Sequence, residues 1–180
     1  NGDEVITVSN TAAPTVADIH ATGALTKFVD IREDNYLMDL SKLEAVITEK
    51  TKCIVVVHLY GQCLNMDYLN AIIKDKDIFV LEDCAQAHGA KIKINSCWKS
   101  VGSFGDISTW SFCQDKIIST GGEGGMITTN NEDIYKKIWS FKDHGKSFSK
   151  INEKNYNFTT LLYMFYCISK YNFWVKDMAN

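Results

Sequence analysis

The stretch SFGDISTWSFCQDKIISTGGEGGMITTN, residues Ser103 to Asn130, carries the strongest structural signal in the chain. It contains two β-rich runs, Ile107–Phe112 and Met126–Thr129, and the polar segment between them holds one lysine, Lys116. The glycine cluster Gly121–Gly125 lets the backbone take positive φ values and approach a ligand closely. We therefore predict two paired strands joined by a tight hairpin at the glycines, with Lys116 on the connection.

A second polar cluster, EDCAQAHG at Glu82–Gly89, lies about thirty residues upstream. It directly follows the apolar run Ile78–Leu81, which has the length and composition of a buried strand. Ligands of open α/β sheets bind at the carboxyl ends of the strands. We therefore expect this cluster to contribute to a binding site.

Strand and helix patterns alternate along the chain, and this order predicts an α/β fold with a mostly parallel sheet and right-handed crossovers. The run KCIVVVHL at Lys52–Leu59 is typical of a strand buried on both faces. The other predicted strands are Glu4–Ser9, Ala24–Val29, Ile78–Leu81, Ile107–Phe112 and Met126–Thr129. The predicted helices cover Pro14–Thr22, Leu40–Ile47, Met66–Ile73 and Ile134–Phe141, with Asp39, Ser41, Asn130 and Asn131 as cap candidates.

Composition narrows the class of protein. Hydrophobic residues make up 46% and charged residues 23% of the 180 residues, which is ordinary for a globular domain. A net charge of -3 argues against nucleic acid or an anionic membrane as the main partner. The first residues show no leader of the secretory type, so we expect a cytoplasmic protein. Six cysteines without C-x-x-C spacing predict reduced thiols, and no metal site is expected.

The last part of the chain has a different composition. Residues 151–180 are rich in Tyr, Phe and Asn and lack a clear period, so we separate them from a domain formed by residues 1–150. Their longest apolar stretch, Leu161–Ile168, is too short to cross a bilayer, which takes about 20 residues.

Taken together, these motifs resemble one family. E-D-x-A-Q-A-H-G, then G-D-x-x-x-W-S-F-x-x-x-K at Gly105–Lys116 and the glycine cluster are similar to the DegT/DnrJ/EryC1/StrS family of sugar aminotransferases, which use pyridoxal 5'-phosphate (PLP). GDEVITVSNT at Gly2–Thr11, VHLYGQ at Val57–Gln62 and KDHG at Lys142–Gly145 fit the same pattern in order. The resemblance implies the three-layer α/β/α large domain of fold type I PLP enzymes.

The resemblance also implies an activity and its partners. Members of this family move an amino group, expected here to come from glutamate, onto a nucleotide-linked ketosugar for amino-deoxysugar and surface polysaccharide biosynthesis. The intact enzymes are homodimers with active sites at the subunit interface. A dimer with an amino-acid donor and a sugar-nucleotide substrate is therefore the expectation for this protein.

Four residues match the family's cofactor-binding positions. Lys116 would hold the PLP aldehyde covalently and move the proton between two carbons; the alternative is a solvated surface lysine. Asp83 would face the pyridine nitrogen, although an Asp after a strand is often only a helix cap. Gln86 would donate a hydrogen bond to the ring hydroxyl, and Ser111 would bind the phosphate; the alternatives are a polar turn residue and an ordinary strand serine.

Three further residues are expected near the substrate. His58, near the end of the predicted strand Lys52–Leu59, and Tyr60, just after it, would line the substrate pocket, and His88 would pack near the cofactor. No second ligand lies close along the chain to any of these histidines, so metal binding is not predicted.

Departures from the family pattern keep other functions open. The family's N-terminal phosphate-binding loop and its C-terminal domain are not found in this sequence, and Ala12 stands where an aromatic ring often stacks on PLP. Near the other end, Trp174 replaces an expected arginine, so we expect the central part of a large domain. An inactive remnant or regulatory module is therefore the main alternative. A PLP-dependent dehydratase is disfavoured by Lys116, and a Rossmann oxidoreductase by Ile127 in the third glycine position of a dinucleotide loop.

Overall fold

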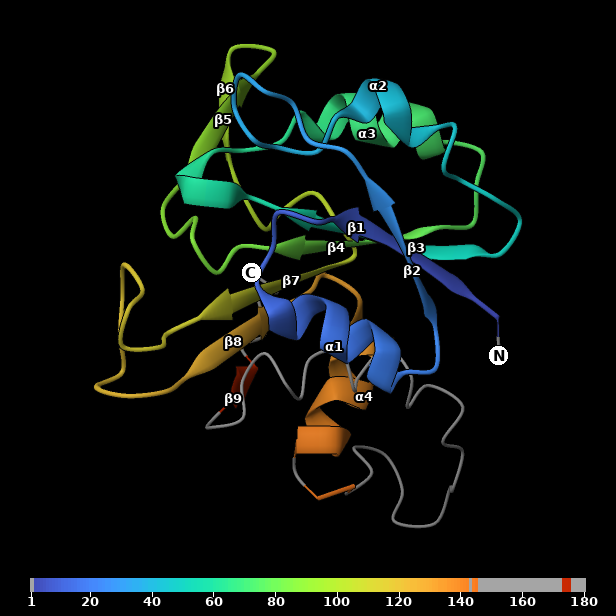
Figure 1. The fold of residues 1–180 in the computed structure, drawn as a ribbon. Coiled ribbons are helices and arrows are strands. Elements are labelled where there is room, and N and C mark those ends of the chain that lie inside the picture. Colours follow the sequence, from blue (N-terminus) through green and yellow to red (C-terminus); the bar gives the residue numbers. More distant parts are fainter. Residues whose placement is uncertain (1, 143, 146–172, 176–180) are drawn as a thin grey trace.

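The computed structural model of the chain describes residues 2–142, 144–145 and 173–175 (Figure 1). The helices are α1 (Ala13–Ala21), α2 (Leu40–Leu43), α3 (Met66–Ile73) and α4 (Glu132–Lys142), with a 3-10 turn η1 (Leu59–Gly61). The strands are β1 (Glu4–Val8), β2 (Leu25–Val29), β3 (Thr51–Val57), β4 (Phe79–Asp83), β5 (Lys91–Ile94), β6 (Cys97–Ser100), β7 (Ile107–Ser111), β8 (Gly125–Thr128) and β9 (Phe173–Val175). The predicted domain division at residue 150 lies outside the described residues.

The main sheet has the strand order β2-β1-β3-β4-β7-β8-β9. Neighbouring strands are parallel, except that β8 runs antiparallel to β7. The prediction of a mostly parallel sheet is therefore confirmed. In this register Val57 pairs with Asp83 and Asp83 pairs with Thr109, so the carboxyl ends of β3, β4 and β7 lie at one edge.

Helices cover both faces of the sheet. Figure 1 shows α2 and α3 on one side and α1 and α4 on the other, which is the predicted three-layer arrangement. The strands are apolar on both faces, as alternate residues show: Val80 of β4 packs in one core cluster and Leu81 in the other. Because side chains alternate along a strand, the Glu82 side chain lies on the face covered by α2 and α3, and the Asp83 side chain lies on the face covered by α1 and α4.

Side-chain caps set the starts of three helices. Asp39 Oδ1 accepts from the Ser41 amide at 3.1 Å, Asn65 Oδ1 from the Tyr68 amide at 3.1 Å, and Asn131 Oδ1 from the Ile134 amide at 3.1 Å. The prediction that the second helix continues to Ile47 is wrong, since α2 ends at Leu43. Beyond it, the Thr48 amide donates to Thr51 Oγ1 at 2.9 Å, and this turn leads directly into β3.

The hairpin β5–β6 was not predicted, although its sequence contains the signal. Lys91–Ile94 alternates between charged and apolar residues, and the two turn residues Asn95 and Ser96 have φ values of 46° and 66°. Positive φ at both central residues is the backbone of a type I′ turn.

The prediction of a tight hairpin turn at Gly121–Gly125 is wrong, because the connection between the two strands is longer. β7 and β8 do pair, with Ser111 opposite Gly125, but residues 112–124 form a long loop between them. The Thr120 amide donates to the Phe112 carbonyl at 3.2 Å, so the loop returns to the end of β7. In Figure 1 this yellow loop extends outward from the sheet.

Within the described part of the chain, no helix has both the length and the apolar character needed to cross a membrane. Five of the predicted thiols lie in that part and are free: Cys53, Cys63, Cys84, Cys97 and Cys113. Cys53 and Cys84 are buried, whereas Cys97 is exposed on the hairpin. Burial raises the pKa of Cys53 to about 12, so this thiol stays protonated.

We predict that Gly105→Ala destabilises the protein. A Cβ at this position would lie 2.7 Å from the Val80 carbonyl oxygen, which belongs to the backbone of β4 and cannot move aside. We expect a loss of about 1–3 kcal/mol in the free energy of unfolding, measured by chemical denaturation. Gly122→Ala is the matched control, because a Cβ there meets no heavy atom within 4 Å. Equal effects of the two substitutions would contradict the prediction.

Candidate functional site

The predicted site residues converge at one edge of the sheet. Asp83 ends β4, Ser111 ends β7, and His58 follows β3 directly. Lys116 lies on the 112–124 loop, where its amide donates to the Cys113 carbonyl at 3.0 Å. Residues that are far apart in sequence therefore come together where an α/β sheet is expected to bind its ligand.

Asp83 provides a buried carboxylate at this edge. The residue is 9% exposed, and Oδ1 accepts a hydrogen bond from the Ala85 amide at 3.0 Å. Burial raises the pKa of Asp83 above its ordinary value, and the Ala85 amide and the charge of Lys116 offset this only in part. Oδ2 has no hydrogen-bond donor among the residues that the structure describes. The carboxylate is thus suited to a cationic N–H group of a ligand.

Lys116 provides an amine with few competing contacts. Its side chain is 21% exposed, and Nζ lies 3.4 Å from the Asp115 carboxylate, a long contact for an ion pair. The lysine charge lowers the pKa of both Asp83 and His88, which places Lys116 within electrostatic reach of the two. The amine is therefore available to a ligand bound against Asp83.

His88 lies among aromatic rings beside these groups. Its ring centroid is 5.5 Å from that of Trp110 and 5.6 Å from that of Phe112. Burial lowers the pKa of His88, and the nearby main chain of Ser111 opposes this effect. Both ring nitrogens are buried, and the approach of the Ser111 main chain falls short of hydrogen-bond geometry, so neither nitrogen has a formed hydrogen bond to a described residue. Buried polar atoms without a partner point to a group that the protein itself does not supply.

Ser111 and Gln86 each keep a hydrogen-bond donor available. Ser111 is 7% exposed and its Oγ accepts from the Cys113 amide at 3.3 Å, which leaves the hydroxyl proton for a ligand. Gln86 Oε1 accepts from the Tyr60 amide at 3.1 Å, so its Nε2 remains a donor. The Tyr60 side chain is 72% exposed at the same edge.

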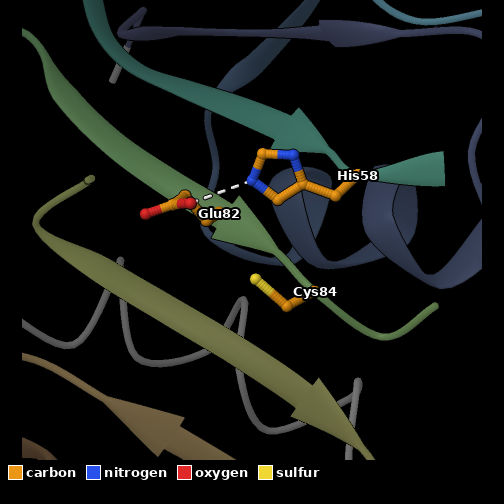
Figure 2. Close-up of side chains that lie close together, drawn as sticks. All are labelled: His58, Glu82 and Cys84. Atoms are coloured by element: carbon orange, nitrogen blue, oxygen red, sulfur yellow. Dashed lines mark hydrogen bonds and ion pairs between the residues drawn. The ribbon is translucent and has the colours of Figure 1, made fainter. Parts of the chain in front are cut away.

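His58 is placed differently from the expectation of a pocket-lining side chain. The residue is completely buried, and its Nε2 lies 2.9 Å from Glu82 Oε2 (Figure 2). Its Nδ1 accepts from the Leu64 amide at 3.2 Å. Both ring nitrogens therefore have protein partners, and in this arrangement His58 offers neither to a substrate.

Glu82 was not singled out from the sequence. It accepts hydrogen bonds from His58 and from three backbone amides, those of Gly102, Phe104 and Gly105. The sequence signal was its place beside Asp83 at the end of an apolar strand. Its amide partners, however, come from a connection whose path the sequence pattern does not predict.

A groove in the described part of the chain lies away from these residues. Its volume is about 770 Å³, and its lining includes Arg32, Asn35, Tyr68 and Lys93. None of the predicted site residues lines it. The candidate site is therefore the edge formed by β3, β4 and β7 and not this groove.

The residues at this edge fit PLP. The cofactor needs an amine for its aldehyde, a carboxylate for its pyridine nitrogen and donors for its oxygens, and Lys116, Asp83, Gln86 and Ser111 are of these types. The two buried nitrogens of His88, which have no hydrogen-bond partner among the described residues, agree with a polar ligand at this place.

Comparisons with known proteins identify the family of the chain. The model of the DegT/DnrJ/EryC1/StrS aminotransferase family matches residues 1–169. GDP-perosamine synthase of Escherichia coli O157:H7 is 45% identical over 144 residues, which are 80% of this chain and 38% of that enzyme. The chain thus spans well under half the length of this relative.

Solved structures give the same result. The aminotransferase from Psychrobacter cryohalolentis has a TM-score of 0.78 and 46% identity, covering 86% of this chain and 38% of that one. The E. coli GDP-4-keto-6-deoxy-D-mannose-3-dehydratase with bound hydrated PLP has a TM-score of 0.73 and 33% identity, covering 81% and 36%. The fold, the edge residues and these matches lead to one conclusion: the chain belongs to the DegT/DnrJ/EryC1/StrS aminotransferase family.

Proposed function

We propose that this protein is a PLP-dependent aminotransferase that moves an amino group from an amino acid, glutamate in the first instance, to the keto group of a nucleotide-linked sugar. The observation that carries the proposal is a partly exposed lysine amine, Lys116, within electrostatic reach of the buried carboxylate of Asp83 at the carboxyl edge of the sheet. The matching aminotransferase from Psychrobacter cryohalolentis and the nucleotide-sugar enzyme GDP-perosamine synthase support it.

Each residue has a role in the proposed reaction. Bound PLP supplies an electron sink that stabilises negative charge on the carbon of the amino group. Lys116 would hold the cofactor through its Nζ, and the same amine would carry the proton between the two carbons. Asp83 keeps the pyridine nitrogen protonated, because a buried carboxylate is stabilised by a cation beside it.

The remaining groups hold the cofactor and order the site. Gln86 donates through Nε2 to the ring oxygen, and Ser111 donates its hydroxyl proton to the phosphate. His88, whose ring contacts those of Trp110 and Phe112, would pack beside the cofactor. One of its ring nitrogens would contact the cofactor or the substrate. Tyr60, which is exposed at the same edge, would contact the substrate. We place the reaction in the cytoplasm and in a homodimer.

The test is a spectroscopic titration of the full-length protein with PLP, followed by borohydride reduction and peptide mapping. We expect a new visible absorption band and a pyridoxyl group on Lys116. If no band forms and no lysine is modified, the protein is an inactive or regulatory member of the family. A pyridoxyl group on a different lysine would refute the assignment of Lys116.

A dehydratase is the second activity represented among the structural neighbours, one of which is a GDP-4-keto-6-deoxy-D-mannose-3-dehydratase. Dehydratases of this family lack the lysine that holds PLP, so the presence of Lys116 favours amino transfer. The dehydratase also binds glutamate on PLP, as a trapped PLP-glutamate geminal diamine in a related structure shows, so release of 2-oxoglutarate alone does not separate the two. Incubation with labelled glutamate and a nucleotide-linked ketosugar does, because an aminotransferase leaves the glutamate nitrogen on the sugar.

A further inference from the structure

Glu82 forms a buried hydrogen-bond network directly behind the proposed cofactor site. It is 0% exposed and accepts from the amides of Gly102 at 2.8 Å, Phe104 at 2.7 Å and Gly105 at 2.6 Å, in addition to His58. Burial raises the pKa of Glu82, but the hydrogen bonds from His58 and the amides outweigh it and leave the pKa lowered. The proposed reaction does not use this ionised carboxylate.

His58 extends this network to the connection between β3 and α3. Because Nδ1 accepts from the Leu64 amide at 3.2 Å, the ring proton is on Nε2, which donates to Glu82 Oε2 at 2.9 Å. Figure 2 shows the ring directed at Glu82 across the ends of β3 and β4. One side chain thus holds both ends of the segment 58–64 to a fixed point on β4.

Tyr60 lies inside this held segment in an unusual conformation. Its φ of 55° is in the left-handed region, which a tyrosine adopts only when its surroundings impose it. In this conformation the Tyr60 amide donates to Gln86 Oε1 at 3.1 Å. An N–H group can pair only with the oxygen of a side-chain amide, so this bond fixes which end of Gln86 faces the ligand.

We infer that His58, anchored on Glu82, is a positioning residue that holds the Tyr60 amide against Gln86 and so presents Gln86 Nε2 as the donor to the cofactor. The inference rests on the proposed function for the role of Gln86, and it assigns His58 to orienting that residue rather than to contacting substrate. Without the anchor, the Tyr60 backbone relaxes from positive φ and the Gln86 amide rotates freely.

A metal site is the competing explanation of the cluster. Ligating atoms of His58, Glu82 and Cys84 all lie within 4.8 Å of one another. However, both nitrogens of His58 and both oxygens of Glu82 already have protein donors or acceptors. Burial also raises the pKa of the Cys84 thiol, which disfavours the thiolate a metal would require. The network is therefore complete without an ion.

The test compares His58→Asn with Glu4→Gln in the full-length protein. Asn keeps an acceptor for Leu64 but is too short to reach Glu82. Glu4 is also a buried carboxylate, bonded to Thr48 Oγ1 at 2.6 Å, but it lies at the opposite, amino end of β1. Both substitutions disturb buried polar groups, and only the first disturbs the link to Gln86.

The first readout is the rate of amide hydrogen exchange, measured on the cofactor-free proteins. We expect the Tyr60 and Leu64 amides to exchange about 10-fold faster in His58→Asn and at the wild-type rate in Glu4→Gln. His58→Gln, which retains a donor for Glu82, is measured if His58→Asn does not fold. A Tyr60 amide that exchanges at the wild-type rate in the folded variant overturns the inference.

Cofactor affinity gives the second readout. We expect His58→Asn to weaken PLP binding about fivefold to tenfold, the equivalent of one hydrogen bond, and Glu4→Gln to leave it unchanged. In a Gln86→Ala background the His58 substitution should add no further loss. Additive losses overturn the inference. If the wild-type protein takes up no PLP, the proposed function fails, and the exchange of Tyr60 still decides the role of His58.

Discussion

Lys116→Ala is expected to abolish covalent attachment of PLP and to lower the rate of amino transfer by at least about 10²–10⁴-fold, because the same amine holds the cofactor and carries the proton. The measurements are borohydride reduction with mass spectrometry and the rate of 2-oxoglutarate formation from glutamate. Noncovalent PLP binding should persist, since Asp83, Gln86 and Ser111 remain. External primary amines should restore part of the rate, because they replace the missing proton carrier.

Lys91→Ala is the matched control. Lys91 is an exposed lysine on the β5–β6 hairpin, and no ion pair joins it to another of the described residues. We expect this variant to keep the pyridoxyl modification on Lys116 and the full rate. A Lys116→Ala protein that is still modified at a lysine, with an unchanged rate, would show that another amine carries the chemistry.

Much of the fold follows from local sequence signals. The apolar run of β3 and the caps Asp39 and Asn131 mark their elements because each signal lies within a few residues of the element it sets. Local signals fail where an interaction with residues farther along the chain determines where an element ends. The periodicity that runs to Ile47 is helical in sequence, but the turn at Thr48 and the pairing of β3 end the helix at Leu43.

The connection between β7 and β8 shows the same limit. Glycines indicate where a chain can turn, but they do not set the length of a loop. In the structure the loop is closed by the Thr120 and Phe112 main chains and by the packing of Gly124, whose added Cβ would lie 2.4 Å from Thr120 Oγ1. These contacts depend on strand register, which glycine spacing alone does not determine.

The site divides in the same way. Asp83, Gln86, Ser111 and Lys116 could be named from motif residues at strand ends, and their roles stay predictions until PLP binding is measured. The role of His58 could not be read from sequence, because it depends on Leu64 and Glu82 lying on either side of one ring. A histidine after a strand looks the same in sequence whether its ring faces a pocket or the core.

Asp83→Asn should make the cofactor-free protein more stable and the loaded protein less active. Because burial raises the pKa of Asp83, the folded state binds this proton more tightly than the unfolded state. The free energy of unfolding therefore falls as pH rises from the ordinary Asp value through the raised one. Asparagine keeps an oxygen for the Ala85 amide and carries no charge.

Thermal unfolding and steady-state rates test both sides of this prediction. At pH 7 without PLP we expect the melting temperature of Asp83→Asn to exceed that of the wild type, by about 2–4 °C for each kcal/mol recovered. The difference should vanish at a pH below the ordinary Asp value. The rate of amino transfer should fall about 10²–10³-fold, because the pyridine nitrogen loses the charge that keeps it protonated. A variant that is both less stable at pH 7 and fully active would mean that Asp83 is a structural cap. A variant that is more stable at pH 7 and less active would mean that the fold tolerates the buried charge of Asp83 because the cofactor, when bound, neutralises it.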